Sequence, residues 1–160
     1  SITNNYHSFS KGDQRNIIDI RNQTFSLKVL PLICYEIIYS GKIFDNNNFD
    51  LIINISEDGW FGKSIGPKQH FTHSIFRAIE SGKYIVRSSN NGIAAIINPL
   101  GIVEKKVNFG KSGYIDFTES LEIQPTVFSK LGNKVFGLLI LLYIFFIFSF
   151  SFMFSFKRIN

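Results

Sequence analysis

A run of 22 uncharged residues near the C-terminus, from Val135 to Phe156, constrains this chain more than any other feature. The run is mostly Leu, Ile and Phe, and about 20 apolar residues in a helix are enough to cross the hydrocarbon core of a bilayer. A helix satisfies its own backbone hydrogen bonds, so the run is predicted to form a transmembrane helix over 135–156. A helix lying in the membrane surface would need a charged face, which the run lacks. Basic residues flank both ends about equally, so charge does not choose the orientation.

The remaining residues suit one domain, because 160 residues accommodate a single domain and a membrane segment. The formal net charge is +5 and the pI is about 9.4. Lys and Arg are scattered and form no Arg-rich run, which argues against a nucleic-acid partner and favours a membrane surface. The chain begins with Ser1, which predicts a processed chain or a fragment.

Hydrophobic periodicity predicts an α/β domain with a mixed sheet. Residues 1–23 are expected to form a loop or an extended entry segment. Strands are expected at 24–33, 51–55, 84–88, 93–98, 102–107 and 113–117. Pro31 is expected at an edge position or a bulge, because proline cannot donate to a ladder. A short helical segment is expected from residue 34 to about 44, followed by a turn at 45–48.

A longer helix is expected between Pro67, which suits a first helical turn, and Gly82, which suits a C-terminal cap. Its apolar stripe would face the core. That stripe consists of Phe71, Ile75, Ala78 and Ile79.

Cys34 is the single cysteine of the chain, so no internal disulfide can form. It follows an apolar strand and precedes a helical segment, where open α/β sheets place their chemistry. Backbone N–H groups at such a turn favour a thiolate and can hold a developing oxyanion. These features leave two interpretations open, a catalytic nucleophile and a small buried structural residue.

A cysteine nucleophile needs a base, and the histidines provide no evident one. His7 lies in the polar entry segment. His70 and His73 are expected on the polar side of the long helix, in a solvated or structural role. Their spacing could bind a metal, but no third ligand is evident, so no metal is expected. Arg77 and Glu80, on the same side, are expected to be a structural ion pair or a solvated face.

Several sequence blocks occur in the order found in one known family. They are Leu32-Ile-Cys-Tyr-Glu36, Asn54 to Gly62, Ser64 to His70, Arg77 to Glu80, and Arg87 to Ile93. The first resembles the nucleophile segment of the nitrilase, or carbon–nitrogen hydrolase, superfamily. The series with the terminal helix is similar to the apolipoprotein N-acyltransferases. Glu57 and Gly59 stand where that family usually has Asn and Ala.

The resemblance implies part of a nitrilase-like α-β-β-α layered sandwich over residues 1–130, followed by one transmembrane helix. It also implies a bacterial inner (plasma) membrane location, with the catalytic domain on the periplasmic side. The implied reaction uses no cofactor. Cys34 would take an acyl chain from a membrane phospholipid as a thioester and pass it to the amino group of a diacylglyceryl-cysteine lipoprotein.

The resemblance further implies roles for single residues. Tyr35 would contribute its backbone N–H to an oxyanion hole, and Glu36 would either support the site or be a helix N-terminal acid. Trp60 and Phe61 would either shape the acyl site or pack in the core.

In the same family a Glu base and an oxyanion-supporting Lys precede the cysteine in the chain. The acidic and lysine residues before Cys34 are Lys11, Asp13, Asp19 and Lys28, and none sits in a matching motif. We therefore expect a C-terminal fragment of an enzyme, or a catalytically inactive membrane-anchored piece. The competing enzyme is a membrane-anchored nitrilase-like amidase, which would share the nucleophile but hydrolyse a small amide.

Overall fold

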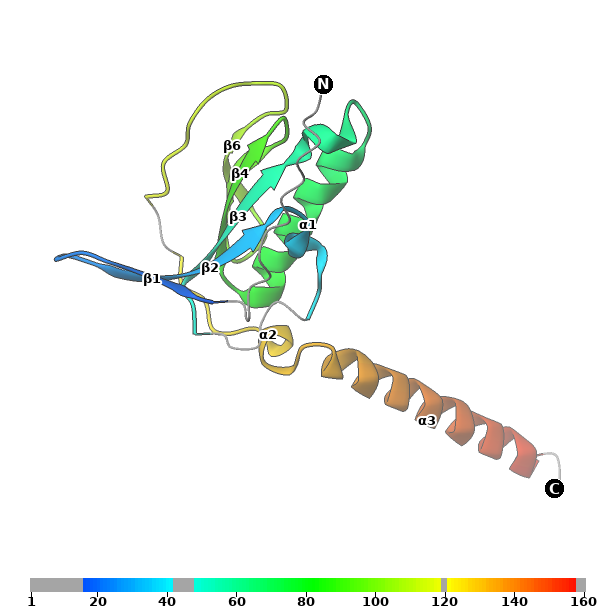
Figure 1. Ribbon diagram of the computed structural model, residues 1–160. Helices are drawn as coiled ribbons and strands as arrows, with labels where there is room; N and C mark the ends of the chain where they lie inside the picture. Colours follow the sequence, from blue (N-terminus) through cyan, green and yellow to red (C-terminus); the bar gives the residue numbers. More distant parts are fainter. Residues whose placement is uncertain (1–15, 42–47, 119–120, 158–160) are drawn as a thin grey trace, which may run out of the picture.

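The computed structural model describes residues 16–41, 48–118 and 121–157, and its centre is a six-stranded mixed sheet (Figure 1). The strands, in chain order and in spatial order, are β1 (Ile18–Arg21), β2 (Ser26–Ile33), β3 (Leu51–Glu57), β4 (Tyr84–Asn90), β5 (Ala94–Ile97) and β6 (Val103–Val107). The strands β2, β3 and β4 are parallel, and the other neighbours are antiparallel. The predicted α/β class with a mixed sheet is confirmed.

The helical elements connect and follow these strands. They are η1 (Cys34–Ile38), η2 (Asp58–Phe61), α1 (Gly66–Ser81), α2 (Val127–Leu131) and α3 (Lys134–Lys157). The helix α1 connects the parallel strands β3 and β4 and lies against one face of the sheet (Figure 1). The main core fills the space between that face and α1. Its buried members are Leu30, Leu32, Ile37, Phe49, Ile52, Ala78, Ile85, Ala95 and Ile97.

The opposite face of the sheet is only partly covered. Strand residues two apart share a face, so the register places Ile33 and Ile55 on this side, and they are 69% and 59% exposed. A strand was expected at 113–117, but the structure has none there. Instead Ile115 and Phe117 pack against the sheet from an irregular segment. Alternating burial therefore arises here without strand pairing.

The ends of α1 follow the prediction. Pro67 lies in its first turn, and Gly82 caps its C-terminus with φ +67° and an N–H bond to the Ala78 oxygen. Only glycine adopts that left-handed conformation without strain. The expected orientation of the helix was partly wrong, because Ile79 is 45% exposed. The polar side chains that turn inward instead are His70, Ser74, Arg77 and Ser81.

The N-terminal part of the sheet was only partly predicted. The strand β1 lies in a stretch expected to be a loop or an extended segment, and it pairs with β2 from Ile18↔Val29 to Arg21↔Ser26. Within the described residues, Pro31 lies beyond this pairing and pairs with Ile53 of β3, so its other side has the character of the expected edge position. The helical segment after Cys34 ends at Ile38. The turn expected at 45–48 falls largely outside the described residues.

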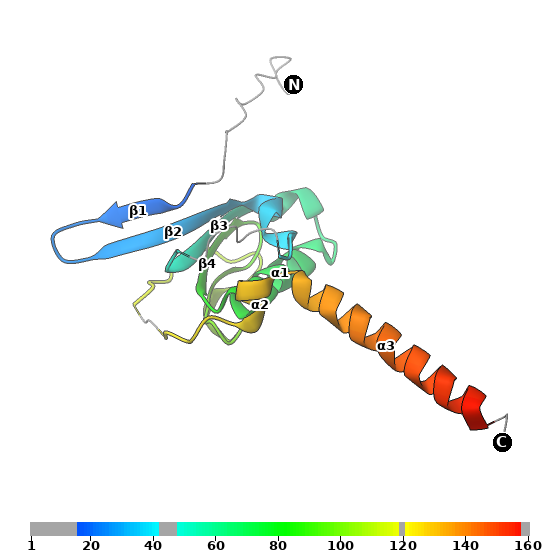
Figure 2. The same cartoon turned by 90° about the horizontal axis from the view of Figure 1, so that it is seen from below.

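The helix α3 extends away from the domain in both views (Figures 1 and 2). An 18-residue window from Lys134 to Ser151 has a mean hydropathy of 2.2 and no residue buried within the domain. Length and composition are therefore those of a helix able to cross a membrane, as predicted for 135–156. The short α2 precedes it and contacts α1.

Candidate functional site

Cys34 lies at the carboxyl end of β2, at the first residue of η1, where the sequence predicted it. Its backbone adopts φ +48°, a left-handed conformation that is uncommon for a residue with a side chain. The thiol is free and half-buried. Strained residues of this kind concentrate at functional sites, so the turn at Cys34 is the starting point for the site.

The side chain of Glu36 stabilises this turn. Its Oε2 accepts a hydrogen bond from the backbone N–H of Ile33 at 2.7 Å, across the start of η1. The carboxylate therefore caps the turn that presents Cys34. This geometry joins the two roles considered for Glu36, because supporting the helix start also supports the candidate nucleophile.

Tyr35 and Phe61 lie together beside His70. The Tyr35 ring stacks on the His70 ring at a centroid distance of 5.3 Å, and Phe61 lies 5.6 Å from the same ring. All three line a cavity of about 390 Å³ next to the Cys34 turn. Trp60 stands apart, with 86% of its surface exposed and no part in the lining of that cavity.

A buried polar cluster lies behind Cys34, at the carboxyl ends of β3 and β4 and the start of α1. Its centre is Asp58, which is fully buried. One carboxylate oxygen lies 2.7 Å from the Ser56 hydroxyl and 2.8 Å from His70 Nδ1. The other accepts a hydrogen bond from Arg87 Nη2 at 2.8 Å. Arg87 also donates to Asn54 Oδ1, which places five buried polar side chains in one network.

The charges of this cluster compensate each other. Burial alone would raise the pKa of Asp58, but hydrogen bonds from His70 and Ser56 and the charge of Arg87 outweigh it and hold that pKa well below its ordinary value. Burial lowers the pKa of Arg87, and the neighbouring carboxylate opposes that change. Asp58 and Arg87 thus form a fully buried ion pair.

Three members of the cluster reach Cys34 directly. His70 Nε2 lies 3.2 Å from the Cys34 carbonyl oxygen, and Asn54 Nδ2 lies 3.4 Å from the same oxygen. Asn54 also donates to the Leu32 carbonyl at 3.0 Å. The Ser56 hydroxyl lies 3.7 Å from Cys34 Sγ. The cluster therefore contacts both the backbone and the thiol of the candidate nucleophile.

This cluster was not predicted. Of the two roles expected for His70, solvated or structural, its 2% exposure excludes the solvated one. Two features of the sequence could have indicated the buried cluster. Asn54 and Ser56 alternate with apolar residues, which places polar groups on one face of the strand, and Asp58 follows two residues later. Arg87 lies within a predicted strand, and a guanidinium that is buried requires an acidic partner.

A structural ion pair or a solvated face was expected for Arg77 and Glu80, and the structure has the ion pair, at 2.9 Å. It does not form a solvated face, since Arg77 is 3% exposed. His73 is half-buried on the same helix. Within residues 16–41, 48–118 and 121–157, no three His, Cys, Asp or Glu side chains gather in a way that could hold a metal ion.

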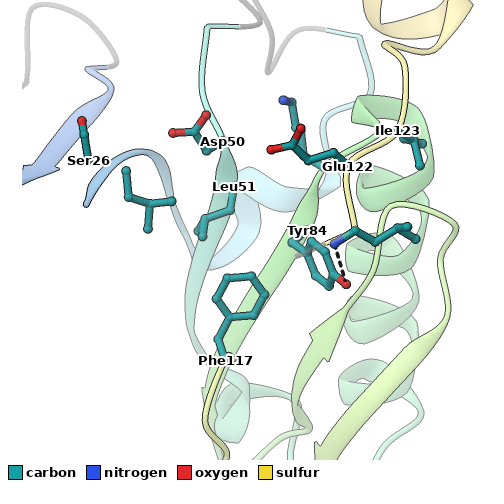
Figure 3. Close-up of a pocket in the computed structure, with 11 residues that line it drawn as sticks. Ser26, Asp50, Leu51, Tyr84, Phe117, Glu122 and Ile123 are labelled. Atoms are coloured by element: carbon teal, nitrogen blue, oxygen red, sulfur yellow. Dashed lines mark hydrogen bonds between the residues drawn. The ribbon is translucent and has the colours of Figure 1, made fainter. Parts of the chain in front are cut away.

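A second cavity, of about 450 Å³, lies at the opposite end of the parallel strands (Figure 3). Asp50 and Tyr84 mark the beginnings of β3 and β4 there, and the Tyr84 hydroxyl accepts a hydrogen bond from Leu121 N. Phe117 and Glu122 complete its wall. Because Cys34 follows the carboxyl end of a parallel strand, this cavity is remote from the candidate nucleophile.

Comparison with known proteins relates most of the chain to one family. The family described as carbon-nitrogen hydrolase matches residues 3–121. The apolipoprotein N-acyltransferase of Rickettsia bellii (strain RML369-C) is 48% identical over 118 residues, which are 72% of this chain and 24% of that protein. A protein of the same name from Bradyrhizobium diazoefficiens is 40% identical over 114 residues, 71% of this chain and 21% of that protein.

The chain thus spans about a quarter of the length of these relatives. Among solved structures, a CN-hydrolase superfamily protein from Xanthomonas campestris, with an arsenic adduct in its active site, aligns with 61% of this chain and 42% of its own. The sequence identity is 17% and the TM-score is 0.47.

Proposed function

Because this chain belongs to the carbon–nitrogen hydrolase family, we propose that it supplies the nucleophile of an enzyme that N-acylates lipoproteins through a thioester on Cys34. The observation that carries the proposal is the half-buried thiol of Cys34, presented at the end of a parallel strand on a left-handed turn. The relatives named apolipoprotein N-acyltransferase favour an acyl group as cargo and a lipoprotein as acceptor.

The proposed reaction has two half-reactions. The Cys34 thiolate attacks the ester carbonyl carbon of a phospholipid, a C–S bond forms, and the C–O bond breaks with its electron pair leaving on the glycerol oxygen, which takes a proton. The α-amino group of a diacylglyceryl-cysteine lipoprotein then attacks the thioester. A C–N bond forms, the C–S bond breaks, the amine gives up a proton, and the thiolate is restored.

The tetrahedral intermediates of both steps carry an oxyanion, and we assign the Tyr35 N–H as one of its donors. Glu36 supports the turn, and Phe61 shapes the aromatic cavity beside it. We assign Trp60 to the mouth of the acyl site, where its exposed ring can meet a lipid chain. The general base and an oxyanion-supporting Lys are assigned to parts of the protein outside these 160 residues.

The helix α3 indicates where in the cell the proposed reaction takes place. We propose that it spans the bacterial inner membrane with the domain on the periplasmic side, so that both lipid substrates reach Cys34 from the bilayer. A site that excludes water favours attack by the amine over hydrolysis of the thioester.

The test uses the complete protein that contains this chain, reconstituted in phospholipid vesicles with a diacylglyceryl lipopeptide. Mass spectrometry of the lipopeptide should show addition of one acyl chain, and Cys34→Ala should abolish it. Transfer that survives Cys34→Ala would refute the nucleophile assignment. Ammonia release from small amides without lipopeptide acylation would identify an amidase instead.

A further inference from the structure

The carbonyl oxygen of Cys34 is held from inside the domain by two side chains. His70 Nε2 lies 3.2 Å from it and Asn54 Nδ2 lies 3.4 Å from it. Asn54 is fully buried and His70 is 2% exposed, so both side chains are fixed by packing and neither is a mobile surface group. The direction of this one carbonyl is therefore set by the core.

His70 is itself fixed from three sides. Asp58 Oδ1 lies 2.8 Å from its Nδ1, and its Nε2 faces the Cys34 carbonyl oxygen. Tyr35 stacks on one side of its ring, at a centroid distance of 5.3 Å. Asp58 is in turn held by Arg87. The ring can neither rotate nor shift without breaking buried polar contacts.

The orientation of that carbonyl determines the orientation of its partner N–H. The Cys34 carbonyl and the Tyr35 N–H belong to the same peptide unit, which is planar and trans, so the two bonds point in opposite directions. Holding the oxygen toward His70 and Asn54 therefore aims the Tyr35 N–H away from the buried cluster.

We propose that His70 is a positioning residue that, with Asn54, aims the Tyr35 N–H at the oxyanion formed when Cys34 is acylated. This inference rests on the proposed function, which supplies the roles of Cys34 and Tyr35. The carboxylate of Asp58 keeps the ring of His70 in the required orientation.

His70 does not serve as the base in this scheme. Its Nε2 contacts the carbonyl oxygen of Cys34 and its Nδ1 contacts Asp58, so neither nitrogen is directed at Sγ. The side chain that approaches Sγ is Ser56, at 3.7 Å. An activity loss on changing His70 should therefore come from a misdirected oxyanion donor, and the experiment must isolate that step.

Two reactions of the same thiol separate the effects. Acylation by a p-nitrophenyl ester passes through an oxyanion, whereas alkylation by iodoacetamide displaces iodide and forms none. Both rates are measured on the complete protein in detergent, and the part of each rate that Cys34→Ala abolishes belongs to this sulfur. Their quotient, acylation over alkylation, cancels changes in thiolate fraction and accessibility. The same two reactions of a short cysteine-containing peptide give the reference value of the quotient, because a peptide has no oxyanion hole.

His70→Asn keeps a nitrogen near Asp58 but cannot reach the Cys34 carbonyl, whereas His70→Gln places its amide nitrogen near the position of Nε2. We expect His70→Asn to lower the quotient by about tenfold or more, toward the peptide value, and His70→Gln to restore part of it. Asn54→Ser, which removes the other donor, should lower it too, and it serves if His70→Asn fails to fold. Ile85→Val, a buried change near the beginning of β4 and so at the end of the parallel strands away from Cys34, is the control for destabilisation and should leave the quotient unchanged.

A quotient that stays at the wild-type value in both His70→Asn and Asn54→Ser would overturn the inference. An equal fall in Ile85→Val, or a wild-type quotient no higher than that of the peptide, would do the same. The proposed function is judged separately, by lipopeptide acylation in the complete protein. If the quotient depends on His70 but the complete protein does not acylate the lipopeptide, the proposed function alone is refuted. If the lipopeptide is acylated but the quotient does not depend on His70, this inference alone is refuted.

Discussion

Asp58 is the acceptor on which three buried donors converge, so Asp58→Leu is a direct test of the polar cluster. Ser56, His70 and Arg87 approach its oxygens at 2.7, 2.8 and 2.8 Å. The Arg87 side chain is fully buried and cannot turn its charge to water. Stranding a buried charge costs about 3–5 kcal/mol, so we expect the free energy of unfolding to fall by about 4 kcal/mol.

The partner substitution completes a double-mutant cycle. Arg87→Met leaves Asp58 with two donors, and we expect it to cost about 3 kcal/mol. Removing both charges in Asp58→Leu/Arg87→Met strands neither, so the double variant should be more stable than the sum of the single effects by about 3 kcal/mol. Asp19→Asn, which breaks an exposed ion pair with Arg21, is the control and should leave stability close to wild type.

Pulse proteolysis across a urea series in detergent measures these differences through the amount of intact chain. Fluorescence of Trp60 is a poor reporter, because this residue is 86% exposed in the folded domain. A cost below about 1 kcal/mol for Asp58→Leu, or single effects that simply add, would refute the description of the cluster as a dry and coupled network.

Three further outcomes follow from features described above. Because the pKa of Asp58 lies well below its ordinary value of 3.8, its stabilisation is complete above about pH 4 and is lost as the pH falls further; urea titrations should show this acid limb flattened in Asp58→Asn. In Gly92→Ala the added carbon would lie 2.1 Å from Asp58 Oδ2, so the melting temperature should fall sharply, whereas Gly137→Ala meets no atom within 4 Å and should not lower it. Ile144→Lys should weaken membrane insertion by about 3 kcal/mol in a glycosylation-mapping assay, while Ile144→Leu should not.

The elements whose ends are marked by neighbouring residues in the sequence were predictable. Pro67 and Gly82 delimit α1, and a long apolar run delimits α3. The position of Cys34 at the end of a strand was predictable too, since an apolar run gives way there to more polar residues. In each case a few neighbouring residues decide the structure.

The buried cluster was not predicted, because it is assembled from segments far apart in the chain. His70 comes from a helix, and Asn54 and Arg87 come from two strands. A polar helix face normally indicates solvent, and only the partner strands reveal that this one is buried. The strand β1 was missed for a related reason, since all four of its residues are exposed and leave no pattern of one-sided burial.

The left-handed backbone conformation at Cys34 lowers local stability while it presents a thiol. Any residue with a Cβ is strained by about 1 kcal/mol at φ +48°, whereas glycine is not. A change of Cys34 to glycine would therefore relax the fold while removing the thiol. Under the proposed nucleophile role, this backbone strain is what presenting a thiol at the turn requires of the fold.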